Sequence, residues 1–109
     1  MAYQRLVKTL TKGNIWLYVC HSLLEKPKYG YEIVKELKEK YKLNAATVTI
    51  YMVLQKMENE GIIRPLSGTG LPGIKYYQLT EKGQQLFKNG ILFIEERLKI
   101  LKGETDGSK

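Results

Sequence analysis

The side chains best suited to binding chemistry gather on one segment, residues 46–60, whose spacing predicts a helix with two distinct faces. The apolar face is made by Ile50, Val53, Leu54 and Met57. The opposite face carries Thr47, Thr49, Met52, Gln55, Lys56 and Asn59. Hydroxyl, amide and ammonium groups can exchange hydrogen bonds with a molecule that lies along the helix. We therefore predict that this face reads or grips a partner, while the apolar face packs on the core.

Residues that carry covalent or metal chemistry are scarce. Cys20 lies in an apolar run and is interpreted as a small buried hydrophobe, and His21 as a structural residue. One cysteine and one histidine cannot build a zinc site. The sequence offers neither paired carboxylates framed by a pocket, nor a nucleophile triad, nor a phosphate-binding loop. We therefore expect no enzymatic activity, no cofactor and no metal.

The charge balance favours a polyanionic partner. The 109 residues include 18 Lys and Arg against 11 Asp and Glu, a formal net charge of +7. Such an excess attracts polyanions at long range and binds them with release of counterions, although a basic surface without a partner would look the same. The single cysteine fits a reducing compartment, and the apolar run 15–24 is too short to span a bilayer. We expect a cytoplasmic protein that makes no membrane contact.

The elements around residues 46–60 predict the fold. Gly61 stands where the end of a helix favours a positive φ. Strand character follows at 62–63 and 75–79, with turn chemistry from three glycines and a proline between 67 and 73. Upstream, helices are predicted over 2–10, 14–25 and 29–41. Two helices joined by a tight link and followed by a hairpin form a winged helix-turn-helix, so the predicted fold is mainly α with a small β hairpin.

The last predicted helix has an unusually wide apolar surface. Thr80 is a suitable N-cap for it. A heptad stripe is formed by Phe87, Ile91, Ile94, Leu98 and Leu101, and a flank of it by Leu86, Phe93 and Ile100. One small domain does not readily cover such an arc, which favours pairing with an identical chain. The alternative is that the arc wraps the chain's own first helix. Trp16 is a second candidate for the interface between protomers.

These patterns divide the chain into three parts. Residues 1–79 form the predicted winged helix-turn-helix, residues 80–102 the C-terminal dimerisation helix, and residues 103–109 a polar tail that we expect to be disordered.

Four blocks of sequence resemble the PadR family of transcriptional regulators. They are Tyr-Gly-Tyr-Glu-Ile at 29–33, Thr-Ile-Tyr at 49–51, Leu-Gln-Lys-Met-Glu-Asn-Glu-Gly-Ile-Ile at 54–63 and Lys-Tyr-Tyr-Gln-Leu-Thr-Glu-Lys-Gly at 75–83. The resemblance covers about residues 12 to 90. It implies a homodimeric winged-helix repressor that pairs through its C-terminal helix and often responds to a small-molecule effector. The single short C-terminal helix resembles the smaller branch of the family.

The sequence departs from the family pattern within residues 46–60, where the family often has a Ser-Pro pair near Ala46-Thr47, and in the turn of the hairpin. Met52 stands where the family usually has proline, and the turn from Gly68 to Ile74 is apolar where relatives often carry arginines. These departures leave Arg64 and Lys75 as the basic contacts expected from the hairpin, and they leave open whether the apolar turn touches DNA.

The resulting hypothesis is a homodimer that places residues 46–60 of each protomer in successive major grooves of an inverted-repeat operator, about 34 Å apart. Base edges would be read chiefly by Gln55 and Lys56. The predicted DNA-binding residues are Tyr29, Thr47, Val48, Thr49, Tyr51, Met52, Gln55, Lys56, Arg64 and Lys75. Of these, Tyr51, Arg64 and Lys75 would hold phosphates, while packing is an equally good role for Tyr29.

Two other functions fit the same sequence. The winged helix could be a protein-interaction module that touches no DNA. Alternatively, the dimer could chiefly sense small aromatic molecules in an interface cavity bounded by Trp16, Tyr18 and Phe93.

Overall fold

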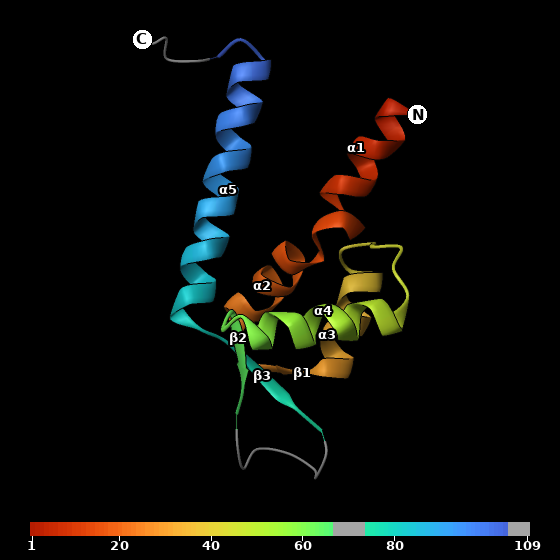
Figure 1. Cartoon of the computed structure of the whole chain (residues 1–109), viewed down its shortest axis with the longest axis vertical. Helices are drawn as coiled ribbons and strands as arrows, with labels where there is room; N and C mark the ends of the chain where they lie inside the picture. Colours follow the sequence, from red (N-terminus) through yellow and green to blue (C-terminus); the bar gives the residue numbers. More distant parts are fainter. Residues whose placement is uncertain (67–73, 105–109) are drawn as a thin grey trace.

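The computed structural model describes residues 1–66 and 74–104 (Figure 1). The helices are α1 (Ala2–Leu10), a short 3₁₀ helix η1 (Lys12–Asn14), α2 (Ile15–Glu25), α3 (Gly30–Glu39), α4 (Thr47–Asn59) and α5 (Glu81–Leu101). The strands are β1 (Lys28–Tyr29), β2 (Ile63–Pro65) and β3 (Tyr76–Leu79). They form one antiparallel sheet in the order β1-β3-β2. The predicted turn at 67–73 and residues 105–109 of the predicted tail lie outside the described residues.

The core confirms the apolar face that the sequence predicts for α4, and α3 buries a face against it. Ile33, Leu37, Ile50 and Leu54 are fully buried together with Ile63 of β2. The helix α4 ends where expected, because Gly61 adopts a φ of +76°. The sequence thus specified which side of α4 packs inward.

The sheet has one strand more than the predicted hairpin. Lys28 pairs with Tyr77 and Tyr29 with Tyr76, so β1 extends the sheet along the outer edge of β3. Two residues are too few to show an alternation of polar and apolar positions, which is why the sequence pattern did not indicate this strand. The next helix is also shorter than predicted. It ends at Glu39, before Lys42 adopts a φ of +57° that an α-helix cannot accommodate.

The predicted N-cap of α5 is confirmed, whereas the residue at the N-cap position of α2 uses its side chain differently. The Thr80 hydroxyl accepts a hydrogen bond from the Gly83 N–H at 3.0 Å and caps α5. Asn14 occupies the cap position of α2, but its side chain donates to the Thr9 carbonyl and accepts from the indole of Trp16 instead of capping the helix.

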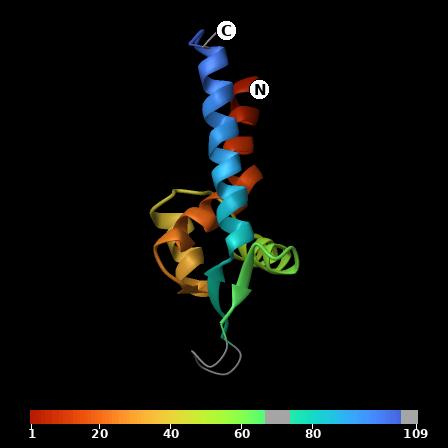
Figure 2. The same cartoon turned by 90° about the vertical axis from the view of Figure 1, so that its left-hand side faces the viewer.

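The helices α1 and α5 project from the core as separate arms, and the start of α1 and the end of α5 lie at the same end of the molecule (Figure 1, Figure 2). Every residue of α1 is exposed, as is every residue of α5 from Ile91 to Leu101. Both arms nevertheless carry large apolar side chains, including Tyr3, Leu6 and Leu10 of α1. The arms therefore leave substantial apolar surface uncovered within one protomer.

An ion pair is buried where α2, β1 and α3 meet. Lys28 is 3% exposed, and its ammonium lies 2.9 and 3.0 Å from the two carboxylate oxygens of Glu36. Buried Ser22 accepts from Lys28 at 3.2 Å and donates to Glu36 at 2.7 Å. Burial would raise the pKa of Glu36, but the hydrogen bonds from Lys28 and Ser22 outweigh it and hold that pKa below its usual value. The pair thus fastens the short strand β1 to two helices.

We expect Lys28→Ala to lower the free energy of unfolding by about 3 kcal/mol, because it leaves a partly buried carboxylate without its cation. Urea denaturation at neutral pH measures the loss. Since the pKa of Glu36 is lowered in the folded protein, this stabilisation is present above the unfolded carboxyl's pKa and is lost as pH falls through the folded value. The gap between wild type and variant should therefore close in acid. Lys26→Ala, at an exposed position two residues earlier, is the control and should change stability little.

Candidate nucleic-acid interface

The outer face of α4 is open along its whole length. Val48 and Met52 are 70% and 68% exposed, and they lie opposite the buried Ile50, Leu54 and Met57. Thr47, Thr49, Gln55, Lys56 and Asn59 are also exposed. The two-faced character predicted for this helix is confirmed, and its six predicted reading residues are all exposed.

Two hydrogen bonds fix polar side chains on this face. The Gln55 amide donates to the Asn59 side chain at 3.1 Å. At the start of the helix, the Lys38 ammonium donates to the Thr47 hydroxyl at 2.6 Å. Lys38 belongs to α3. Its charge lies at the first turn of α4, where it adds a cation to the candidate interface.

A groove of about 490 Å³ runs between α4, the start of α3 and the residues that lead into β3. It brings together three of the predicted contacts, Tyr51, Gln55 and Lys75, with Tyr31, Ile74 and Tyr77. Tyr31 was not among the predicted site residues. Its place within the Tyr-Gly-Tyr block, beside the predicted Tyr29, was the available signal. The groove is lined by hydroxyl, amide and ammonium groups, which are suited to a phosphate backbone.

Gly30 makes the close packing beside this groove possible. A Cβ on Gly30 would lie 3.0 Å from the Tyr51 ring and 3.6 Å from that of Tyr77. The glycine between the two tyrosines therefore lets α4 lie close to the start of α3.

The two basic residues among the predicted phosphate contacts, Arg64 and Lys75, are each bound to a neighbour within the protein. Lys75 donates to a Glu58 carboxylate oxygen at 3.0 Å, and that hydrogen bond raises the pKa of Lys75. Arg64 donates through Nε and Nη2 to the Gln78 amide oxygen at 3.1 and 2.9 Å. An ammonium has three N–H donors and a guanidinium five, so both side chains keep donors beyond these bonds. Arg64 lies on β2 and does not line the groove.

Tyr29 has the packing role that the sequence left open. Its ring stacks on Tyr31 with centroids 5.6 Å apart and lies 4.6 Å from that of Tyr76. Its N–H donates to the Glu32 carboxylate at 2.8 Å, so this N–H is already used. Tyr29 does not line the groove, but its ring packs on Tyr31, which does.

The predicted dimer residues other than Trp16 lie on α5, while Trp16 lies on α2. Of these, the side chains exposed on α5 are Ile91, Ile94, Leu98 and Leu101, while Phe87 and Trp16 are half-buried against the core.

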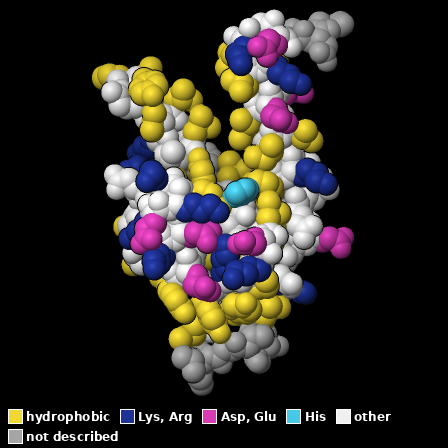
Figure 3. Space-filling view, turned by 180° about the vertical axis from the view of Figure 1, so that it is seen from behind, with side chains coloured by type: hydrophobic (Ala, Val, Ile, Leu, Met, Phe, Trp, Pro, Cys, Tyr) yellow, Lys and Arg dark blue, Asp and Glu magenta, His cyan; other side chains and the backbone are white. Residues whose placement is uncertain are grey.

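The arms α1 and α5 border a cleft. Figure 3 shows hydrophobic side chains along both sides of this cleft, with the histidine at its base. That base is a cavity of about 300 Å³ in which His21 lies among Leu10, Tyr18, Phe87 and Ile94. His21 is satisfied as predicted, because its Nδ1 is 2.6 Å from the Tyr41 hydroxyl.

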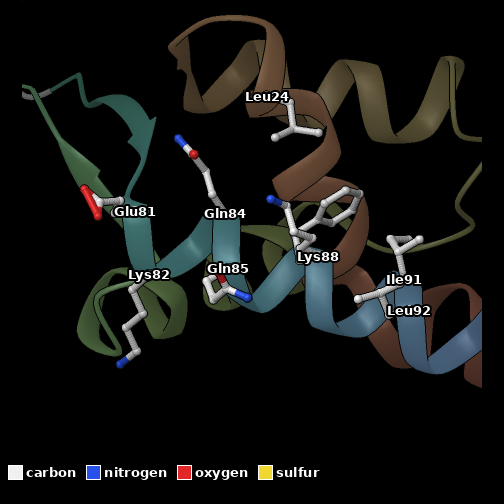
Figure 4. Close-up of a pocket in the computed structure, with 9 residues that line it drawn as sticks. Leu24, Glu81, Lys82, Gln84, Gln85, Lys88, Ile91 and Leu92 are labelled. Atoms are coloured by element: carbon white, nitrogen blue, oxygen red, sulfur yellow. The ribbon is translucent and has the colours of Figure 1, made fainter.

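A second groove of about 650 Å³ follows the same helix nearer its N-terminus. Figure 4 shows Leu24 of α2 opposite Lys88 and Ile91 of α5. Phe87 and Ile91 line this groove and the cavity beside His21, so the apolar surface along α5 is continuous. Glu81 carries the one carboxylate in the lining of this groove. A lining with a single carboxylate is better suited to packing than to catalysis.

The three residues expected around a small-molecule cavity do not meet within one protomer. Tyr18 lines the cavity beside His21. Trp16 lines a different cavity, of about 410 Å³, next to Lys12, Lys56 and Leu86. Phe93 is 61% exposed further along α5. Both Trp16 and Tyr18 pack partly against the core.

Across residues 1–66 and 74–104, no three His, Cys, Asp or Glu side chains lie close enough together to hold a metal ion. In the same part of the chain, no helix combines the length and the apolar character needed to cross a membrane. Burial raises the pKa of the Cys20 thiol to about 12, so this side chain is an inert hydrophobe.

The helices α3 and α4 follow one another across a short link, and α4 has one exposed face. The antiparallel strands β2 and β3 form a wing beside them. This arrangement defines a winged helix-turn-helix. The sequence profile of the transcriptional regulator PadR-like family matches residues 19–89, and the chain belongs to this family. Its members are transcriptional regulators and not enzymes.

Solved structures agree with this assignment. A PadR family transcription regulator from Clostridium difficile R20291 is 26% identical and superposes with a TM-score of 0.70, over 83% of this chain and 96% of that one. Bacillus subtilis PadR, solved in complex with operator DNA, is 25% identical with a TM-score of 0.62, over 71% of this chain and 45% of that one. An uncharacterised protein of Lysinibacillus sphaericus is 29% identical over 79 residues, which are 69% of this chain and 72% of that protein.

Proposed function

We propose that this chain is a homodimeric, sequence-specific regulator that binds double-stranded DNA through α4 and represses transcription by occupying a promoter. The observation that carries the proposal is the open polar face of α4 beside a groove lined by Tyr51, Gln55 and Lys75. The net charge of +7 favours a polyanion. A relative of the same fold, Bacillus subtilis PadR, was solved with operator DNA.

Pairing of two copies is proposed from the uncovered apolar surface of the arms. An isolated helix of nine residues such as α1 is unstable in water unless its apolar face is packed. The distal half of α5 offers matching apolar side chains over a comparable length. We assign residues 1–79 to DNA binding and residues 80–102 to dimerisation, so that the two α4 helices meet one face of the duplex.

Selection of bound duplexes from a random pool tests this function directly. An inverted repeat with half-sites about one helical turn apart would support symmetry, dimerisation and direct readout together. Recovery of no preferred sequence, or of a single half-site, would contradict a symmetric regulator.

Mutation of a residue that reads base edges should change sequence preference, whereas mutation of a residue that contacts phosphates should change affinity for all sequences. Gln55→Ala is expected to cost about 1–3 kcal/mol at one or two operator positions and to relax preference there, because it removes an amide from the reading face. Lys75→Ala is expected to weaken binding to all sequences alike and to reduce the salt slope by about one. Fluorescence anisotropy with operator and scrambled duplexes, at several salt concentrations, separates the two. A Gln55→Ala variant with unchanged affinity and preference would show that the reading face is wrongly assigned.

A small aromatic effector is a second element of the proposal. It is supported by the cavity of about 410 Å³ that joins Trp16 to Thr49 and Lys56 of α4, since a ligand there would touch the reading helix. Quenching of the single tryptophan by planar aromatic compounds, with parallel loss of operator binding, is the expected result.

A further inference from the structure

The ion pair between Glu58 and Lys75 joins the last turn of α4 to the residue just before the strand β3. The Lys75 ammonium lies 3.0 Å from the Glu58 carboxylate, with the two side chains 46% and 22% exposed. Glu58 lies seven residues after Tyr51, on the same edge of α4, and Lys75 lines the groove with Tyr51 and Gln55. The pair is therefore placed at the border of the surface that would meet DNA.

An acidic residue at this border requires an explanation. A carboxylate beside a phosphate backbone repels it, and a lysine bound to that carboxylate is partly neutralised. Charge alone would thus make Glu58 a disadvantage for DNA binding. The geometry points to a compensating benefit, because one of the three ammonium N–H groups is used by Glu58 and the others are left for a second acceptor.

A lysine on a flexible stem loses side-chain entropy when it binds a phosphate. A lysine already held by a carboxylate has lost part of that freedom in the free protein, so less is lost on binding. The backbone at Lys75 is also fixed, since its carbonyl accepts a hydrogen bond from the Gly30 N–H at 3.3 Å. Both ends of the Lys75 side chain are therefore anchored beside the groove.

We infer that Glu58 is a positioning residue for DNA binding: it holds the Lys75 ammonium at the edge of the groove, where its remaining N–H groups donate to a backbone phosphate. This inference rests on the proposed function. It assigns to an acidic side chain of the reading helix a favourable contribution to binding a polyanion.

Glu58→Ala tests the inference because charge and positioning predict opposite results. Removal of a negative charge would by itself tighten binding. We expect instead that Glu58→Ala weakens binding to operator by about threefold to fivefold, the scale of an exposed ion pair. Glu58→Gln should bind at least as well as wild type, because the amide oxygen still accepts from Lys75. Glu60→Ala, at an exposed acidic residue just beyond α4, is the charge control and should bind slightly more tightly.

The Lys75→Ala background provides the decisive comparison. Without the lysine there is nothing to position, so Glu58→Ala should then tighten binding instead of weakening it. Circular dichroism and thermal melting must show that each variant folds. Tighter binding by Glu58→Ala in the wild-type background, or the same effect in both backgrounds, would overturn the inference while leaving the proposed function intact. A wild-type protein that ignores duplex DNA at low salt would instead refute the proposed function.

Discussion

Gly83→Ala is expected to lower the free energy of unfolding by about 3 kcal/mol, the upper range for inserting a methyl group into a well-packed site. An ideal Cβ on Gly83 would lie 2.3 Å from the Ile62 carbonyl oxygen and 2.6 Å from a methyl group of Leu79. The carbonyl cannot move aside cheaply, because it accepts hydrogen bonds from the Thr80 N–H at 3.1 Å and the Thr80 hydroxyl at 3.0 Å. The clash therefore falls on the junction that joins α5 to the sheet.

Gly90→Ala is the matched control on the same helix. The nearest atoms to its Cβ would be a Leu17 methyl group at 3.1 Å and the edge of the Trp16 ring at 3.2 Å. These are ends of side chains that can adjust, and alanine improves helix propensity by up to about 1 kcal/mol. We expect a small change of either sign. Equal urea midpoints for Gly83→Ala and wild type would show that the first turn of α5 is not packed on Ile62 as described.

The second large effect is expected from Ile94→Glu combined with Leu98→Glu. These side chains are 37% and 52% exposed in the protomer, so their replacement should leave the protomer folded. In the proposed dimer they are covered, and two charges buried in an apolar interface would prevent pairing. Loss of the second binding module should reduce operator affinity by about 100-fold or more, the usual scale of the gain from linked binding.

Sedimentation velocity measures the association state of this variant, and anisotropy with the operator measures its affinity. Gln85→Glu combined with Asn89→Glu adds the same charge at exposed polar positions of α5 and should leave the dimer intact. If the Ile94 and Leu98 variant stayed dimeric, or if the wild type were monomeric at working concentrations, the assignment of residues 80–102 to dimerisation would be wrong.

Much of the architecture is determined by local pattern in the sequence. The helical period of Ile50, Leu54 and Met57 specified which face of α4 is buried and which is open. Gly61 and Thr80 marked a helix end and a helix start because their conformational and hydrogen-bonding preferences act within one turn. Such features depend on residues close in sequence, so they can be derived without knowing the fold. The apolar arc of α5 also depends on the spacing of residues close in sequence, so it too can be derived without knowing the fold.

The tertiary structure alone decided which distant residues meet. Lys28 is buried against Glu36, eight positions away. Lys75, which the sequence predicts as a phosphate contact, is paired with Glu58, seventeen positions away. Gly83 reads as an ordinary helical glycine until the Ile62 carbonyl lies where its side chain would be. The strand β1 exists because β3 provides its hydrogen-bonding partner. None of these contacts leaves a periodic pattern in the sequence, because each depends on how whole helices and strands pack. The same packing forms the groove beside α4 and places the ion pair of Glu58 and Lys75 at the edge of that groove.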